Sequence, residues 1–520
     1  MVATVTITQR EGYGLYENKR GYCASGAASK TIAFERGGIN YPNCLEEVRN
    51  DGIELPYSDY CQKLANAGTN ILRVKWTGRS ESRAGGSYGM EPPPYGTYNI
   101  WQTALDSSNL TTYRSQQVTY PVDSAAWAAS NVKELTDQCE AYGISLHVVL
   151  FESSEFEAGW TTHPWNSNNQ YIDGTECEVA DRGFISNAYE FYTDATAIQA
   201  AKDRIDFIVN MLGTNKAVVS WELFAEMTWL LASDFWGEDE WGAEMISHIR
   251  DEVTPWVETM AAYLRAADPY NRPIAMGLLR TPSNGIWPVD PDNSLNVKNE
   301  PMLVYPVDIC CMNDYEGTFS RAVQDMRAAQ AYTDKLLWIT QMSPTLTDES
   351  PVDEPSPFLE SKKLLWVPVC GERWGLGSLR WPGLREIAPN VWATGGYADS
   401  DLYSIPGITK VFSENVGWNA NWDIDNYPFD DYIVATGTSE GLSYGDGENV
   451  TMLAEWPSGG SKTIDISNLS NGAYTFTYYD WTDGTIAGTL TPTAAGGSLS
   501  MNLDVTSFQD NMIVAHLIKD

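Results

Sequence analysis

One apolar run at residues 216–227 constrains the fold most strongly. Val218 and Val219 lead through Trp221 into two carboxylates, Glu222 and Glu226. An amphipathic helix predicted over residues 194–212 precedes the run, so we interpret it as a buried parallel strand whose carboxyl end opens onto solvent. In a (β/α)8 barrel the catalytic groups lie at that end of the strands. The sequence therefore places Glu226, just past the strand, at a candidate active site.

Strands of this kind alternate with helices along most of the chain. This alternation favours the α/β class, with one parallel (β/α)8 TIM barrel rather than two separate sheets. The other seven strands are predicted over residues 31–41, 70–76, 144–151, 272–279, 302–312, 336–342 and 374–381. The helices are predicted over residues 57–67, 125–142, 194–212, 242–267, 321–333 and 358–370.

The pattern changes near residue 418. Residues 463–466 and 474–478 alternate apolar and polar side chains, and the pairs Asn471-Gly472 and Asp483-Gly484 supply turns. We predict an antiparallel β-sandwich over residues 420–520. The barrel is predicted over 31–418, and an irregular or β cover over 1–30. A chain of 520 residues is long enough for a barrel of about 250 residues plus such a domain.

The charge and the aromatic content indicate the kind of partner. A formal charge of −36 repels polyanions, so we expect neither nucleic acid nor membrane surfaces as partners, although plain solubility also explains it. The 20 Trp and 28 Tyr residues exceed what a core requires and suit stacking on flat apolar faces such as sugar rings. No stretch has the 18 consecutive apolar residues of a membrane span. We expect a secreted or extracellular protein, and any signal segment is either absent or already removed from this sequence.

The cysteines and histidines give no metal-binding pattern. The eight cysteines form no CxxC pair, and the four histidines are too scattered to suggest zinc, so we expect no metal. Three cysteines fall in predicted helices or strands and are expected to be small buried residues: Cys139, Cys310 and Cys370. Four lie in or near predicted loops and are available for disulfides: Cys23, Cys44, Cys61 and Cys177.

The strand-four run resembles a known signature. Residues 221–226, Trp-Glu-Leu-Phe-Ala-Glu, resemble the "WELxNE" motif of clan A glycoside hydrolases, the cellulase and mannanase type. Arg73 matches the strand-two arginine of that clan, and residues 337–342 match its strand-seven "PxxxTE" tip. The segment from residue 450 is similar to the small β-domain that often follows such barrels. The resemblance extends over most of residues 31–520.

This resemblance implies a retaining hydrolase of β-linked poly- or oligosaccharides that needs no cofactor. Such an enzyme has two carboxyl groups about 5–5.5 Å apart, one acid/base and one nucleophile. Glu226 takes the acid/base position. Gln341 stands where the clan has its nucleophilic glutamate, and Ala225 stands where it has an asparagine that contacts the sugar 2-hydroxyl. An amide is a poor nucleophile and carries no charge to stabilise an oxocarbenium ion.

Three interpretations of Gln341 remain open. The chain is a nucleophile-disabled variant of an active enzyme, a natural carbohydrate-binding protein without catalysis, or an enzyme that uses another carboxylate. Candidates for that carboxylate are Glu152, Asp314 and Glu316. We favour the first interpretation because the other barrel elements are intact.

Further residues are assigned to substrate binding. Arg73 is expected to orient the side chain at position 341, with a core ion pair as the alternative, and Tyr315 to hydrogen-bond it. Trp381 is expected to form the floor of the subsite for the cleaved sugar, and Asn313 or His163 to replace the missing 2-hydroxyl contact. The remaining candidates for binding are Trp76, Asn166 and Trp221.

Overall fold

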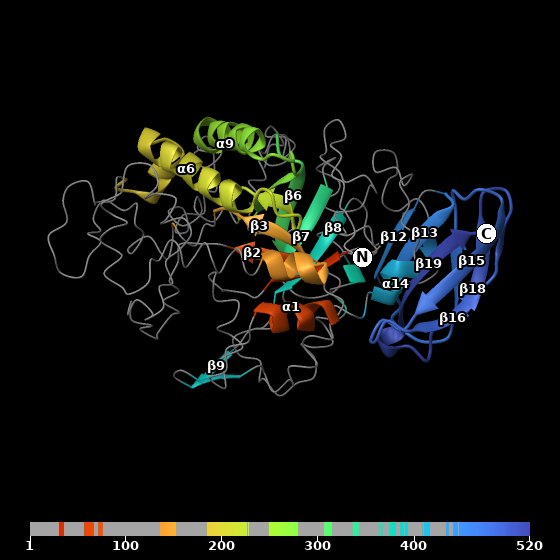
Figure 1. The fold of residues 1–520 in the computed structure, drawn as a ribbon. Coiled ribbons are helices and arrows are strands. Elements are labelled where there is room, and N and C mark those ends of the chain that lie inside the picture. Colours follow the sequence, from red (N-terminus) through yellow and green to blue (C-terminus); the bar gives the residue numbers. More distant parts are fainter. Residues whose placement is uncertain are drawn as a thin grey trace.

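The computed structural model describes about half of the chain, including a barrel and a β-sandwich (Figure 1). The described residues are 31–35, 57–66, 71–75, 136–151, 156, 185–225, 227, 249–278, 306–314, 336–342, 363, 366–367, 374–380, 385–388, 391–393, 408, 410–415, 433–435, 440–445 and 447–520. The predicted cover over residues 1–30 lies outside them, as do residues 77–121.

Eight parallel strands close into a barrel in chain order, as the sequence predicts. They are β1 (Thr31–Glu35), β2 (Ile71–Lys75), β3 (Ser145–Val149), β4 (Val218–Glu222), β5 (Ile274–Leu278), β6 (Ile309–Asp314), β7 (Leu336–Met342) and β8 (Trp374–Arg380). The ring closes where Thr31–Glu35 pairs residue by residue with Leu376–Arg380. Because all the strands are parallel, their carboxyl ends lie at one rim.

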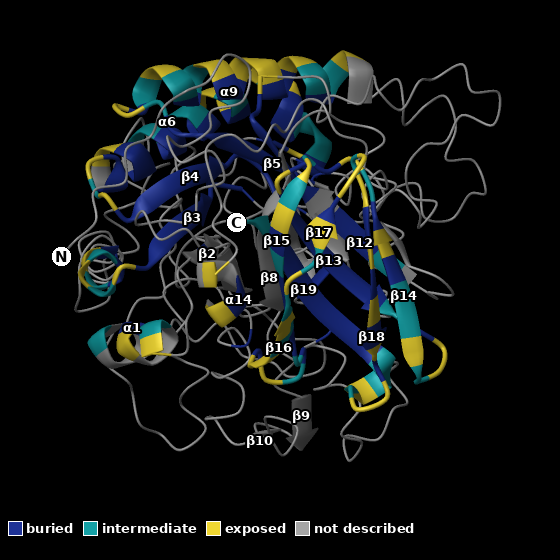
Figure 2. Cartoon of the chain, turned by 90° about the vertical axis from the view of Figure 1, so that its right-hand side faces the viewer, coloured by how far each residue is buried: buried dark blue, intermediate teal, exposed yellow. Residues whose placement is uncertain are grey.

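Helices cover the outside of this ring. They include α1 (Tyr57–Asn66), η5 (Ala188–Tyr192), α6 (Ala195–Leu212), a π-helical turn η6 (Ile249–Val253) and α9 (Thr254–Ala267). The carboxylate of Asp194 accepts hydrogen bonds from the first-turn amides of α6 and fixes its start. Figure 2 shows buried β3 and β4 beneath α6 and α9, whose outer faces are exposed. The helices therefore bury one face against the strands.

An aromatic cluster fills the space between these helices and the ends of β3 and β4. Phe151 and Phe224, just past the two strands, stack with their ring centroids 6.2 Å apart. Phe191 of η5 and Trp256 of α9 also belong to the cluster, with centroids 4.9 Å apart. All four residues are buried. This packing fixes the path of the chain beyond β4, which leads to the candidate site.

The described C-terminal region is antiparallel, as predicted. One sheet has the order β11–β14–β18, and the other β12–β13–β19–β15–β16, with β17 paired to β15. The strands are β11 (Ile433–Ala435), β12 (Glu440–Gly445), β13 (Asn449–Glu455), β14 (Ser461–Ile466), β15 (Gly472–Tyr479), β16 (Ile486–Leu490), β17 (Thr493–Ala494), β18 (Leu499–Asp504) and β19 (Met512–Lys519), with a short 3-10 turn η10 (Gln509–Asn511). Residues 416–432 lie outside the described part, so the domain boundary at 418–420 stays a prediction.

Buried polar and aromatic contacts join the sandwich to the barrel side of the chain. Lys363 lies in the predicted helix 358–370, and its Nζ is 2.9 Å from Glu455 Oε1 and 2.7 Å from Asp510 Oδ2. Trp366 Nε1 donates to the carbonyl of Trp481 at 2.8 Å. These contacts hold Lys363 and Trp366 against the sandwich. Two further elements precede it: the hairpin β9 (Arg385–Ala388) and β10 (Val391–Ala393), and α14 (Lys410–Asn415).

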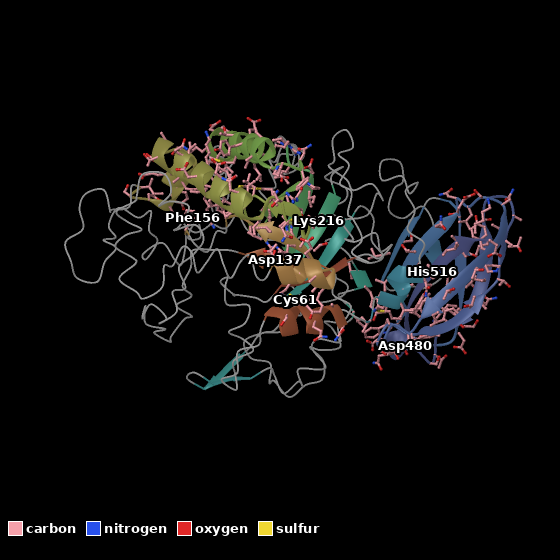
Figure 3. The ribbon with its side chains drawn as sticks, in the orientation of Figure 1. Cys61, Asp137, Phe156, Lys216, Asp480 and His516 are labelled. Atoms are coloured by element: carbon pink, nitrogen blue, oxygen red, sulfur yellow. The ribbon has the colours of Figure 1, made fainter. Side chains whose placement is uncertain are left out.

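His516 of β19 is buried in this joint (Figure 3). Its ring lies 5.8 Å from that of Phe412 in α14, and its Nδ1 lies 3.3 Å from the Tyr479 hydroxyl. Burial disfavours the charged imidazolium and lowers the pKa of His516 to about 4. The folded chain therefore binds this proton less readily than the unfolded chain, in which the pKa is about 6.5.

This difference predicts a loss of stability in mild acid. The contribution of neutral His516 is complete above pH 6.5 and declines as the pH falls to about 4, by up to roughly 3 kcal/mol. The free energy of unfolding, measured by denaturant titration at pH 7 and pH 4.5, should fall more in the parent than in His516→Gln. Equal declines in the two proteins would contradict this role of His516.

No helix in the described part of the chain is long and apolar enough to cross a membrane.

Candidate active site

Two of the predicted site residues are neighbours at the carboxyl rim of the barrel. In the register between β6 and β7, Asn313 pairs with Gln341 and Asp314 pairs with Met342. The structure describes the backbone of these residues. β6 spans Ile309–Asp314, whereas the sequence predicted a strand over residues 302–312. Because the strand ends two residues later than predicted, Asn313 belongs to it and not to the loop after it. Position 341 and its neighbour Asn313 thus lie side by side.

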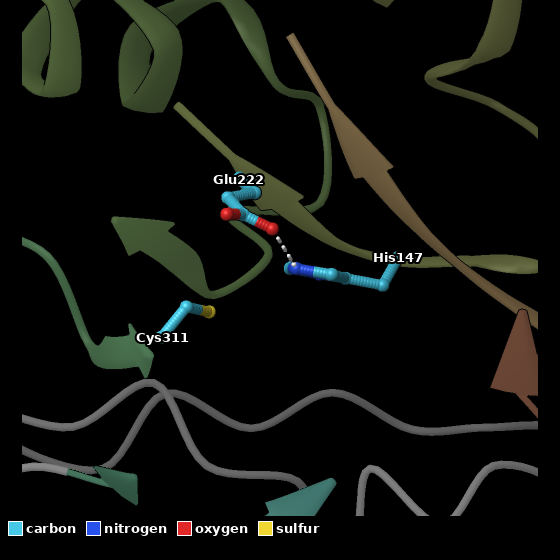
Figure 4. Close-up of side chains that lie close together, drawn as sticks. All are labelled: His147, Glu222 and Cys311. Atoms are coloured by element: carbon cyan, nitrogen blue, oxygen red, sulfur yellow. Dashed lines mark hydrogen bonds and ion pairs between the residues drawn. The ribbon is translucent and has the colours of Figure 1, made fainter. Parts of the chain in front are cut away.

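A buried polar network lies inside the barrel, on β2, β3 and β4. The guanidinium of Arg73 donates two hydrogen bonds to the carboxylate of Glu222, from Nε to Oε2 at 2.7 Å and from Nη2 to Oε1 at 2.8 Å. His147 Nε2 lies 2.9 Å from Glu222 Oε2, and its Nδ1 lies 2.7 Å from Ser220 Oγ. Figure 4 shows the imidazole pointing at the carboxylate. All four residues are buried, so the network joins three adjacent strands from within.

The network keeps Glu222 ionised. Complete burial opposes ionisation of Glu222 and raises its pKa, but the charge of Arg73 and the hydrogen bond from His147 outweigh burial and lower the pKa to about 2. A neutral imidazole satisfies the geometry when its Nε2 donates to Glu222 and its Nδ1 accepts from the Ser220 hydroxyl. The carboxylate and the guanidinium then neutralise one another in the barrel interior.

Solved structures share this architecture. A glycoside hydrolase family 5 protein from Bacteroides vulgatus superimposes with a TM-score of 0.56 at 13% identity, over 100% of this chain and 94% of the other. Another structure, described as a glycoside hydrolase, gives a TM-score of 0.53 at 12% identity, over 100% of this chain and 97% of the other. The chain has the fold of a clan A glycoside hydrolase. No family model matches the sequence, and no curated protein matches it.

On this glycoside hydrolase fold, the described partner of Arg73 differs from the predicted one. The sequence assigned its guanidinium to position 341, but both hydrogen bonds above go to Glu222, which is the core ion pair considered as the alternative. The reason is the barrel geometry, because the side chains of Arg73 and Glu222 both point into the ring. The side chain of Gln341 lies outside the described ones, so a contact between it and Arg73 stays a prediction.

Trp221 is a core residue and not the sugar-binding residue that the sequence predicted. It is fully buried, and side chains alternate along a strand, so Trp221 points away from the interior that Ser220 and Glu222 face. The guanidinium carbon of Arg272 lies 5.7 Å from its ring centroid. Trp221 therefore contributes to the packing between the barrel and the helices.

Ala225 is fully buried, and its amide donates to the carbonyl of Phe151 at 2.8 Å. Its methyl group has no hydrogen-bonding atom, so the side chain of residue 225 cannot hydrogen-bond a sugar hydroxyl. Ala225 therefore contributes packing and a backbone hydrogen bond, and its side chain offers substrate no polar contact.

Six predicted site residues lie outside the described part of the chain, and their roles stay predictions: Trp76, His163, Asn166, Glu226, Tyr315 and Trp381. The same holds for the alternative carboxylates Glu152 and Glu316. For Asp314 the structure describes the backbone alone.

Sequence reasoning missed the roles of His147 and Glu222. The available signal was a polar residue at the centre of an apolar strand, because a histidine among Leu146, Val148 and Val149 requires a buried partner. What was lacking was the register that places His147 next to Ser220 on β4. That register follows from closure of the whole barrel and not from any local pattern.

His147, Glu222 and Cys311 bring three potential metal ligands together, with their ligand atoms within 4.8 Å of one another (Figure 4). Imidazole, carboxylate and thiolate are zinc ligands. However, Arg73 already holds both oxygens of Glu222, so a cation here would have to displace a buried guanidinium. We therefore interpret the cluster as an ion-pair network.

Proposed function

We propose that the carboxyl rim of this barrel binds a neutral β-linked polysaccharide or oligosaccharide. In this proposal the site corresponds to that of a retaining β-glycoside hydrolase, with Gln341 at the position of the nucleophile. The observation that carries the proposal is the pairing of Gln341 on β7 with Asn313 on β6, at the same end of the closed barrel to which β4 leads. In (β/α)8 enzymes the substrate binds at this end.

The proposed catalytic pair lacks its nucleophilic carboxylate. Glu226, four residues past the end of β4, is the proposed acid/base that protonates the leaving oxygen. Gln341 matches a glutamate in size and shape, so a sugar still fits, but its amide cannot form the covalent intermediate. We infer a nucleophile-disabled hydrolase that binds its substrate without cleaving it. The reaction assigned to the site needs no cofactor.

The second candidate function is that of a natural carbohydrate-binding protein that catalyses no reaction at this site. It is favoured by the coincidence of two departures from the clan motif, Ala225 and Gln341. Both remove groups that act mainly in the transition state, and neither blocks the binding of a ground-state sugar. Both candidates share the neutral glycan as partner and an extracellular location, which we also propose.

Binding and turnover should be measured on the same panel of β-glucan, β-mannan, xylan and galactan oligosaccharides. We expect calorimetry to detect binding of at least one class, and product analysis to detect no cleavage. Cleavage by the parent would mean that another carboxylate attacks, and absence of both binding and cleavage across the panel would contradict the proposal. Trp381→Ala should weaken binding, whereas substitution of the distant Tyr270, on the loop after α9, should not.

A further inference from the structure

Two buried thiols face one another on neighbouring helices outside the barrel wall. Cys61 belongs to α1, and Cys139 to the helix described over residues 136–142. Their Sγ atoms are 3.7 Å apart, and both residues are fully buried. Figure 3 labels Cys61 and Asp137 on these two helices. We propose that Cys61 and Cys139 form a disulfide when the chain folds in an oxidising compartment.

The geometry requires a small adjustment. A disulfide has its sulfurs about 2.05 Å apart, so the two Sγ atoms must approach by roughly 1.7 Å. Each side chain already points at the other, because the sulfurs are within hydrogen-bonding distance. Rotation about the Cα–Cβ bonds and a slight shift of α1 supply the approach.

The oxidation proceeds by thiol–disulfide exchange with a small-molecule disulfide. One cysteine loses its proton, and its thiolate attacks the small disulfide, forming a mixed disulfide and releasing one small thiolate. The second cysteine thiolate then attacks the protein sulfur of the mixed disulfide and releases the second small thiolate. The two cysteines are oxidised, and one small disulfide is reduced to two thiols. Because both sulfurs are buried in the folded chain, exchange takes place before α1 packs or during its local opening.

The disulfide would link the helix before β2 to the helix before β3. It would therefore close a segment of 78 positions between the two cysteines. Closing so long a segment restricts the unfolded chain and raises the unfolding temperature. This inference is independent of any sugar and goes beyond the proposed function.

The other cysteine pair in the described part serves as an internal control. Cys310 and Cys311 are buried and adjacent on β6. Adjacent side chains on a strand point to opposite faces, so these two cannot reach one another. Their thiols should stay reduced under conditions that oxidise the proposed pair.

The test is a non-reducing peptide map of the full chain after refolding with a glutathione redox buffer, with free thiols alkylated in denaturant. We expect one linked peptide joining Cys61 to Cys139, with Cys310 and Cys311 alkylated. The oxidised chain should also unfold several degrees above the reduced chain. That increment should vanish in Cys61→Ser and in Cys139→Ser and persist in Cys310→Ser.

Alkylation of both Cys61 and Cys139 after oxidative refolding would overturn the proposal, as would a link from either one to another cysteine. If a serine variant fails to fold, the peptide map of the parent decides the question alone.

Discussion

Gln341→Glu is expected to convert the chain into an active hydrolase on the glycan that it binds. Loss of a nucleophile typically costs several orders of magnitude in rate, so the restored carboxylate should raise the rate by at least about 10³-fold over the parent. Binding affinity should change little, because glutamate and glutamine have nearly the same shape. Initial rates on the best-bound oligosaccharide, with product anomers followed by NMR, measure both the gain and the expected retention of configuration.

Two companion variants make this result specific. Gln341→Asp places a carboxylate one methylene short of the sugar and should recover little activity. Glu226→Gln in the Gln341→Glu background should abolish hydrolysis of substrates with poor leaving groups, since those need protonation. Full activity in that double variant would remove Glu226 from the mechanism. Binding without turnover by Gln341→Glu would favour the carbohydrate-binding protein over the disabled enzyme.

Arg73→Met is expected to destabilise the barrel by about 3–5 kcal/mol. The substitution leaves the carboxylate of Glu222 buried without its two guanidinium hydrogen bonds, and an uncompensated buried charge is costly. The pKa of Glu222 should rise, since burial then outweighs what remains of the stabilisation. Denaturant unfolding at pH 7 measures the loss.

A matched arginine provides the control. Arg265 also pairs with a carboxylate, Asp308, at 2.8 Å, but its side chain is 22% exposed. Arg265→Met should cost less, because Arg265 is itself partly exposed, so its removal opens the buried Asp308 carboxylate to water, and the amide of Ile274 still donates to that carboxylate. Replacing both members of the buried pair, as Arg73→Met with Glu222→Leu, should recover much of the loss. Equal losses for Arg73→Met and Arg265→Met would contradict a special role for the buried network.

The sequence was informative where an element is determined by its own residues. β7 has the predicted bounds because the apolar run Leu336–Ile339 defines most of it. α6 begins one residue after the predicted start, because the carboxylate of Asp194 caps it. β6 begins later than predicted because Pro306 lacks an amide hydrogen, and the first amide that pairs with β5 is that of Asp308, which donates to the carbonyl of Ile274. The prediction used apolar composition alone and therefore extended the strand over residues before Ile309.

Predictions failed where distant segments decide the outcome. The helix predicted over residues 242–267 contains the π-helical turn η6 before α9, next to Pro255, which cannot donate the amide hydrogen bond of a regular helix. The partnership of Arg73 with Glu222 joins residues 149 positions apart. It depends on which face of each strand points inward, a property of the closed barrel that no local motif specifies.

The most direct measurement is the separation of the side-chain Cδ atoms of residues 226 and 341 in a crystal structure of Gln341→Glu bound to its oligosaccharide. A retaining pair should place the carboxyl groups about 5–5.5 Å apart, on opposite sides of one glycosidic linkage. A separation of roughly 15 Å or more, or an oligosaccharide bound at the opposite end of the barrel, would contradict the assignment of this rim as the site.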